Sequence, residues 1–174
     1  VKHIVTACPH CLHTLKNEFP DFGGVYEVKH HTTLLNELIA EGRLKVNTKT
    51  SGLLTTFHDP CYLGRHNDVY DAPRELLDAS GNKQVEMKQN KDASFCCGAG
   101  GAQMWKEESG PTRVNIERTR QALETGAEQI AVGCPFCKTM LQDGVNDHEK
   151  SEQMIVRDIA EILVEQVGEP AVKA

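Results

Sequence analysis

The sequence predicts an α/β fold with a mainly parallel sheet and flanking helices. Short apolar runs of strand length alternate with longer segments whose apolar residues recur at helical spacing. One stretch also occurs twice, because residues 4–11 (IVTACPHC) match residues 130–137 (IAVGCPFC) at an offset of 126. A helix, a short strand and another helix are expected after each copy. We therefore expect two pseudo-repeated halves, of which the first is incomplete.

The first half is expected over residues 1–50, as the C-terminal part of one cysteine-rich unit. Its predicted elements are a strand over 3–7 that runs into residues 8–11, then a helix with Leu12, Leu15 and Phe19 on one face that Pro20 ends, a strand over 26–28, and a helix over 32–41 that Gly42 ends. The pair His30-His31 just before the last helix is expected at the surface.

The second half is expected over residues 51–174, as a complete unit. Its predicted elements are a strand over 53–57, a helix from Asp71 with Pro73 in its first turn and Ser80-Gly81 as its stop, a strand over 85–88, a helix from Pro111 to Thr125, a strand over 129–132, a helix that Cys134 opens, and a strand at 155–156 before a closing segment to 167. Trp105 is expected in the core.

Composition excludes several classes of function. A net charge of −6 with scattered lysine and arginine argues against binding to nucleic acid. No apolar run approaches the roughly 20 residues of a membrane span, and no signal peptide is visible. The chain starts inside a predicted strand at Val1, so we expect it to be a piece of a longer protein. Seven cysteines without a secretion signal favour metal or redox chemistry over disulfides.

Five of the seven cysteines form one pattern: Cys61, Cys96, Cys97, Cys134 and Cys137. The vicinal pair is followed by Gly98-Ala99-Gly100-Gly101, where bare backbone can donate N–H groups to sulfur. Loops that follow parallel strands gather at one edge of a sheet, and helix N-termini stabilise thiolates there. Four thiolates suit a cubane [4Fe–4S] cluster, and a fifth permits an expanded, non-cubane arrangement. We interpret this set as an iron–sulfur site.

Two other interpretations of the cysteines stay open. Zinc is a rival metal, since sites of four cysteines are tetrahedral and Cys8, His10, Cys11 and His13 place two thiols beside two imidazoles. The spacing of Cys61 and the vicinal pair is unlike a compact zinc ribbon, so zinc is expected only where the cluster is lost. A CxxC between strand and helix also suits thiol–disulfide exchange, but one such pair suffices for that chemistry.

Residues around the cysteines have structural interpretations as well as functional ones. His58, Asp59, Arg65 and His66 flank Cys61 and are candidates for hydrogen bonds around a cluster. His10 and His13 are interpreted as ordinary loop and helix residues. Cys8 and Cys11 are half of a second site, to be completed upstream.

The motifs resemble those of a known family. Cys61, Cys96-Cys97-Gly98 and Cys134-Pro135-Phe136-Cys137 resemble the cysteine-rich CCG domain of heterodisulfide reductase. The stretches from Ala7 to Glu18 (ACPHCLHTLKNE) and from His58 to His66 (HDPCYLGRH) are similar to those of heterodisulfide reductase-related membrane iron–sulfur oxidoreductases, including those paired with electron transfer flavoprotein.

The resemblance implies a function and its partners. Cys61, Cys96, Cys97, Cys134 and Cys137 would ligate a [4Fe–4S] cluster, cubane or non-cubane. The domain would pass electrons between a flavoprotein or dehydrogenase donor and a quinone, with heterodisulfide-type reduction as an alternative. Ferredoxin-like and membrane parts would lie upstream in the parent protein, which would face the cytoplasm. The fragment alone is expected to be inactive.

Overall fold

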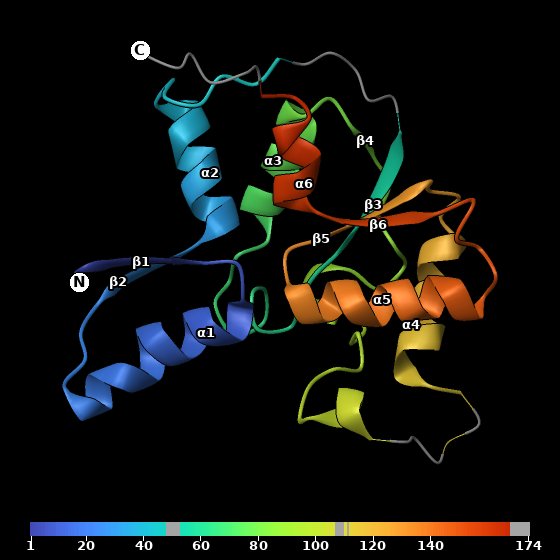
Figure 1. Ribbon diagram of the computed structural model, residues 1–174, viewed down its shortest axis with the longest axis horizontal. Coiled ribbons are helices and arrows are strands. Elements are labelled where there is room, and N and C mark those ends of the chain that lie inside the picture. Colours follow the sequence, from blue (N-terminus) through green and yellow to red (C-terminus); the bar gives the residue numbers. More distant parts are fainter. Residues whose placement is uncertain (48–52, 107–109, 111, 168–174) are drawn as a thin grey trace, which may run out of the picture.

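The computed structural model describes residues 1–47, 53–106, 110 and 112–167 (Figure 1). Its strands are β1 (His3–Thr6), β2 (Glu27–His30), β3 (Leu54–His58), β4 (Lys83–Gln84), β5 (Gln129–Val132) and β6 (Ile155–Asp158). Its α-helices are α1 (Pro9–His13), α2 (His31–Ala40), α3 (Asp71–Ala79), α4 (Val114–Leu123), α5 (Pro135–Asp147) and α6 (Ile159–Val164). Shorter helical segments are η1 (Thr14–Glu18), η2 (Phe19–Phe22), η3 (Lys91–Ala93) and η4 (Gln103–Trp105).

The main sheet has the strand order β4-β3-β5-β6, and every pair in it is parallel. Strand β5 lies inside it and is buried at all four positions, as a strand covered on both faces requires. Ile130 and Val132 pack with α4 and α5, whereas Ala131 packs with α3 and α6. Figure 1 shows these helix pairs on opposite sides of β5 and β6. The predicted α/β class with a parallel sheet is confirmed.

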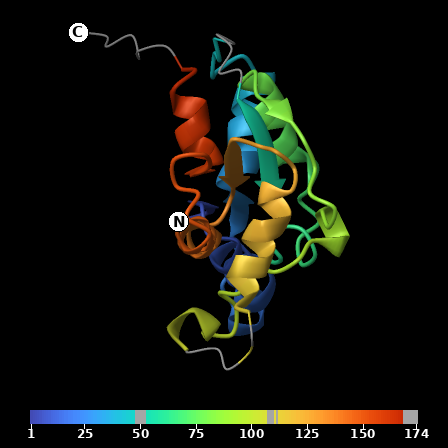
Figure 2. The same ribbon diagram turned by 90° about the vertical axis from the view of Figure 1, so that its right-hand side faces the viewer.

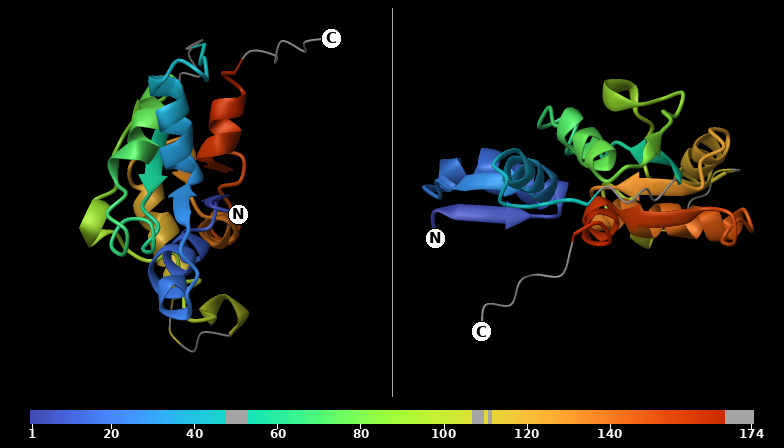
Figure 3. Two further views of the ribbon diagram at one scale, coloured as in Figure 1. Left: turned by 90° about the vertical axis from the view of Figure 1, so that its left-hand side faces the viewer. Right: turned by 90° about the horizontal axis from the view of Figure 1, so that it is seen from above.

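The expected repeat is visible in the order of elements. Strands β1 and β2 form a separate two-stranded parallel sheet, and β1-α1-β2-α2 follows the same order as β5-α5-β6-α6. Figure 3 shows the β1–β2 unit beside the larger sheet. His31 Nε2 and Asp158 Oδ1, 3.0 Å apart, link α2 to the start of α6. The expected boundary at residues 50 and 51 lies outside the described residues and stays a prediction.

Three predicted elements differ in the structure. The strand expected over 85–88 is wrong, because pairing with β3 falls at Lys83 and Gln84 and the chain leaves the sheet after the Val85 N–H bonds to the Thr55 carbonyl. Pro20 does not end the first helix, since η1 and η2 carry the helical path on to Gly23, whose φ of +82° stops it. The fourth α-helix begins at Val114, and Pro111 lies outside the described residues.

Two predictions about exposure are also wrong. His30 and His31 are buried, with 1% and 9% of their surface exposed, because α2 packs against the main unit and covers them. Trp105 is 78% exposed, on the η4 segment that projects from the rest of the molecule (Figure 2). Among the described residues, no helix combines the length and apolarity that crossing a membrane would need.

Candidate metal centre

Two of the three cysteine loops start at neighbouring strand ends. Strands β3 and β5 pair so that His58 lies opposite Val132. Cys61 follows the first strand by three residues and Cys134 follows the second by two. The parallel sheet therefore delivers both loops to the same edge, where ligands collect in α/β folds. Cys134 is also the N-cap of α5, whereas Cys61 precedes a series of turns and Cys96-Cys97 lies in a loop.

The structure brings all five thiols of the predicted set together as a chain of contacts. Cys61 contacts Cys96, and Cys96 contacts its neighbour Cys97. The Sγ atoms of Cys97 and Cys137 are 3.3 Å apart, and Cys137 in turn contacts Cys134. Three of these side chains are buried and two are partly exposed. Residues from three separate loops thus form one sulfur-lined site.

Backbone amides surround these sulfurs. The Gly98 N–H donates to Cys96 Sγ over 3.2 Å, as the glycines after the vicinal pair predict. Gly98 has a φ of +88°, and a Cβ there would lie 3.1 Å from Val114 Cβ and 3.3 Å from the Asn115 nitrogen. The position therefore needs glycine for both its backbone angle and its packing. Further N–H groups that face the thiols belong to Tyr62, Ala99, Phe136 and Cys137.

The thiols strongly perturb one another's pKa. The contacts with Cys61 and Cys97 lower the pKa of Cys96 to about 2, and the contact with Cys137 lowers that of Cys134 to about 5. The contact with Cys137 lowers the pKa of Cys97, but Cys96 and burial outweigh it and bring that pKa to about 12. The contact with Cys96 raises the pKa of Cys61, and the contact with Cys134 raises that of Cys137.

This distribution of pKa values among the thiols tests whether the residues fit a metal cluster. Five neighbouring thiols cannot all lose their protons in the absence of a metal, since each thiolate disfavours the ionisation of the next thiol. A cationic metal centre removes that conflict, because it displaces the protons and draws the sulfurs to itself. Sulfur ligands in this number, with N–H donors around them, suit an iron–sulfur cluster. The donor set fits the group that the sequence predicts.

The residues that flank Cys61 divide between the sulfur site and its support. His58 is buried, and one of its ring nitrogens lies within 4.8 Å of the Cys97 and Cys137 sulfurs. Asp59 instead forms an ion pair with Arg74 and accepts from the Lys91 N–H. Arg65 donates to the Ser94 carbonyl over 2.6 Å, which ties the Cys61 loop to the loop of the vicinal pair.

The two histidines of the first CxxC helix differ. His10 packs on the Tyr62 ring with ring centroids 4.3 Å apart. His66, the residue after Arg65, stacks on the same ring at 4.3 Å. His10 also hydrogen-bonds to Cys134, which helps to lower the pKa of that thiol. His10 is thus a hydrogen-bond partner of a site cysteine, and its interpretation as a residue that does not ligate metal stays a prediction. His13 bonds to the Asn17 amide and keeps the ordinary role expected for it.

Cys8 and Cys11 stand apart from the five-thiol set. They contact each other, and burial raises the pKa of Cys8. Cys11 is exposed and Cys8 is partly exposed. Their expected role as half of a second site stays a prediction. Arg118 and Ser94, which contact each other beside the site, carry no signal in the sequence, since neither residue type marks a cluster.

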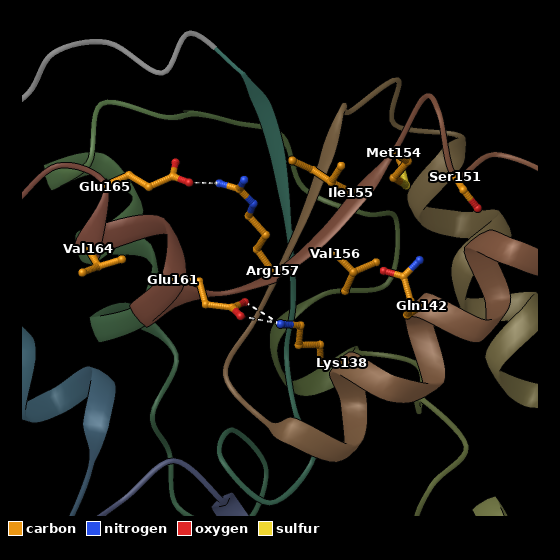
Figure 4. A pocket seen from close by; sticks show the side chains of 10 residues that line it. All are labelled: Lys138, Gln142, Ser151, Met154, Ile155, Val156, Arg157, Glu161, Val164 and Glu165. Atoms are coloured by element: carbon orange, nitrogen blue, oxygen red, sulfur yellow. Dashed lines mark hydrogen bonds and ion pairs between the residues drawn. The ribbon is translucent and has the colours of Figure 1, made fainter.

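Two cavities lie beside α5. A cavity of about 510 Å³ lies between α5, β6 and α6 (Figure 4). Ion pairs of Lys138 with Glu161 and of Arg157 with Glu165 cross it, and none of the five cysteines lines it. A smaller cavity of about 230 Å³ is also lined by none of the five cysteines, but its lining includes Ala99 and Phe136, which lie close to them in sequence. Its lining comprises His10, Ala99, Gly100, Gly101, Ala102, Met104, Trp105 and Phe136.

Comparison with known proteins places this site in a family context. Residues 55–142 match the family model described as "CCG: Cysteine-rich domain". The chain is 48% identical over 170 residues to the EtfAB:quinone oxidoreductase of Syntrophomonas wolfei. This match covers 94% of this chain and 24% of that protein. The chain is 47% identical over 168 residues to the "Probable iron-sulfur-binding oxidoreductase FadF" of Bacillus subtilis, with 96% and 24% covered.

A more distant relative has a different named activity. The chain is 38% identical over 171 residues to one subunit of the dihydromethanophenazine:CoB--CoM heterodisulfide reductase of Methanosarcina barkeri, with 96% of this chain and 41% of that protein covered. The chain thus spans about a quarter of the length of the first two relatives. The family match covers residues 55–142, including all five clustered cysteines, and the chain belongs to the CCG cysteine-rich domain family.

Proposed function

We propose that Cys61, Cys96, Cys97, Cys134 and Cys137 hold one [4Fe–4S] cluster, and that this domain is an electron relay within a larger oxidoreductase. The observation that carries the proposal is the unbroken chain of contacts among five thiols from three loops. The relatives named as iron–sulfur-binding and quinone oxidoreductases support it.

The cluster would supply one-electron redox chemistry, and the protein would set how readily it occurs. The backbone N–H groups of Gly98 and Ala99 stabilise negative charge on the vicinal sulfurs. Burial of Cys97, Cys134 and Cys137 keeps water away from the inner side of the site. The fifth thiol gives a donor set that suits a non-cubane cluster as well as a cubane one.

The longer relatives support a choice of partners. Because this chain corresponds to about a quarter of two of them, the donor and acceptor sites are proposed for the whole protein rather than for this domain. A flavoprotein would donate electrons and a quinone would accept them, through ferredoxin-like and membrane parts outside this chain.

Zinc remains the chemical rival. A nitrogen of His58 with the thiols of Cys97 and Cys137 forms a group within 4.8 Å, which resembles the start of a mixed zinc site. Five thiols exceed the four ligands of a structural zinc site, however. We therefore assign zinc only to protein that has lost its cluster.

Thiol–disulfide exchange is less well supported. Cys134 combines a pKa of about 5 with a CxxC partner, which suits a nucleophilic thiol. Its side chain is nevertheless fully buried, with 0% of its surface exposed. A nucleophile must reach its disulfide substrate, so this site does not favour the reaction in the described conformation.

The test uses the full-length protein that contains this chain, prepared without oxygen. Cys97→Ser should abolish the visible absorbance and the EPR signal of the cluster that this site holds. Cys11→Ser is the matched control, because Cys11 is exposed and outside the five-thiol set. It should leave that signal in place. An unchanged spectrum in Cys97→Ser would contradict the ligand assignment.

A further inference from the structure

Arg118 is a buried cation beside the sulfur site. It lies in α4 with 0% of its surface exposed. Its Nε donates to His58 Nδ1 over 3.0 Å. The remaining nitrogens donate to the Gln89 carbonyl, the Gln121 side chain and the Ser94 hydroxyl, at 2.8, 2.9 and 3.2 Å. Each of the three guanidinium nitrogens thus donates at least one hydrogen bond.

The charge of Arg118 has no carboxylate partner within ion-pair distance among the described residues. Burial lowers the pKa of Arg118 to about 10, so the side chain still carries its charge near neutral pH. A buried charge requires compensation. The groups whose negative charge favours the cation are Asp59, which is already paired with Arg74, and the sulfurs of Cys137, Cys97 and Cys96. The thiols of Cys97 and Cys137 have raised pKa values, so these sulfurs would supply counter-charge as thiolate ligands of the proposed cluster.

The hydrogen bond from Arg118 Nε to His58 Nδ1 fixes the tautomer of His58. A guanidinium only donates hydrogen bonds, so Nδ1 of His58 must accept and carries no proton. A ring whose Nδ1 carries no proton is neutral. A neutral imidazole has one proton, and that proton must then lie on Nε2.

This arrangement decides what His58 can do next to Cys97 and Cys137. A metal ligand needs a free nitrogen lone pair. Arg118 occupies the lone pair of Nδ1, and Nε2 bears the proton. His58 therefore offers no free lone pair to a metal, although one of its ring nitrogens lies within 4.8 Å of both sulfurs.

We propose that Arg118 is a positioning residue of the sulfur site, which holds His58 with its proton on Nε2 and provides buried positive charge next to the five thiols. The charge-balancing part rests on the proposed cluster, whereas the tautomer part does not. Through Ser94, Arg118 also holds the start of the loop that carries the vicinal cysteines.

The tautomer is tested on reduced protein without metal by nitrogen-15 NMR of the histidine rings. Wild-type His58 should show a protonated Nε2 and an unprotonated Nδ1 across pH 6–8. In Arg118→Met, His58 should no longer be held in this one tautomer. In Arg120→Met, on the exposed side of the same helix, His58 should keep it. A proton on Nδ1 in the wild type would overturn the proposal, even if Arg118→Met fails to fold.

The charge is tested on the loaded full-length protein. Arg118→Met should shift the midpoint potential of the cluster to a more negative value, because the reduced cluster loses a cation, and Arg120→Met should leave it unchanged. Pulsed EPR of the wild type should show no nitrogen bound directly to the metal. An unshifted potential in Arg118→Met, or the coupling of a ligating imidazole in the wild type, would overturn the proposal. Absence of any cluster would instead contradict the proposed function, and the NMR result would remain.

Discussion

Replacement of Gly98 by alanine tests whether the loop of the vicinal cysteines is held against α4. A left-handed φ costs a non-glycine residue about 1–2 kcal/mol. The added Cβ would also lie 3.1 Å from Val114 Cβ and 3.3 Å from the Asn115 nitrogen. The second atom belongs to the helix backbone and cannot move alone, so overpacking should add about 1–3 kcal/mol. We expect a total loss of about 2–5 kcal/mol in the free energy of unfolding.

Gly126→Ala is the matched control for this experiment. Gly126 has a φ of +71°, and a Cβ there meets no atom within 4 Å. Both variants share the backbone strain and the effect of alanine on the unfolded chain, so their difference isolates the contact with α4. Urea unfolding of reduced protein without metal, followed by circular dichroism, gives both values. If Gly98→Ala is no less stable than Gly126→Ala, the packing of this loop against α4 is wrong.

Two further predictions concern buried polar groups. Burial lowers the pKa of His30 to about 4, so the unfolded chain binds a proton that the folded protein does not between about pH 6.5 and 4. Stability should therefore fall as the pH falls through this window, and His30 should account for about 2 kcal/mol between pH 8 and pH 5. Urea unfolding at both pH values should show a smaller loss in His30→Gln, and an equal loss would refute this role. Asp59→Ala should cost about 1–3 kcal/mol, because it removes the buried carboxylate that accepts from Arg74 and from the Lys91 N–H and leaves Glu86 as the remaining partner of Arg74. The exposed pair of Arg43 and Glu41 is the control, and Glu41→Ala should cost less than about 1 kcal/mol; similar costs for the two variants would contradict the buried pair.

The sequence predicts those parts of the fold whose signals are local. The apolar run of β5 and the repeated strand before each CxxC are such signals, since apolar residues at strand length between polar breaks can be read directly. The five-cysteine site follows from the same logic. Parallel strands β3 and β5 place the Cys61 and Cys134 loops together, as their position after the strands indicates.

The remaining features depend on tertiary contacts that no short window shows. Val85–Lys88 has the composition of a strand, but pairing with β3 is available only two residues earlier. His30 and His31 look like a polar pair before a helix, yet the packing of α2 buries both. Arg118 lies in a helix rich in charged residues, and nothing in VNIERTRQAL distinguishes it from exposed Arg120. Only the fold shows which arginine faces the sulfurs.

The iron, acid-labile sulfide and zinc content of the full-length protein, prepared without oxygen, tests the central claim most directly. The comparison is between the wild type and a variant that carries serine at Cys61, Cys96, Cys97, Cys134 and Cys137. We expect the variant to lose about four iron and four sulfide atoms per chain relative to the wild type, with no zinc in either. Equal iron and sulfide in both proteins, or zinc without sulfide in the wild type, would contradict a cluster held by these five thiols.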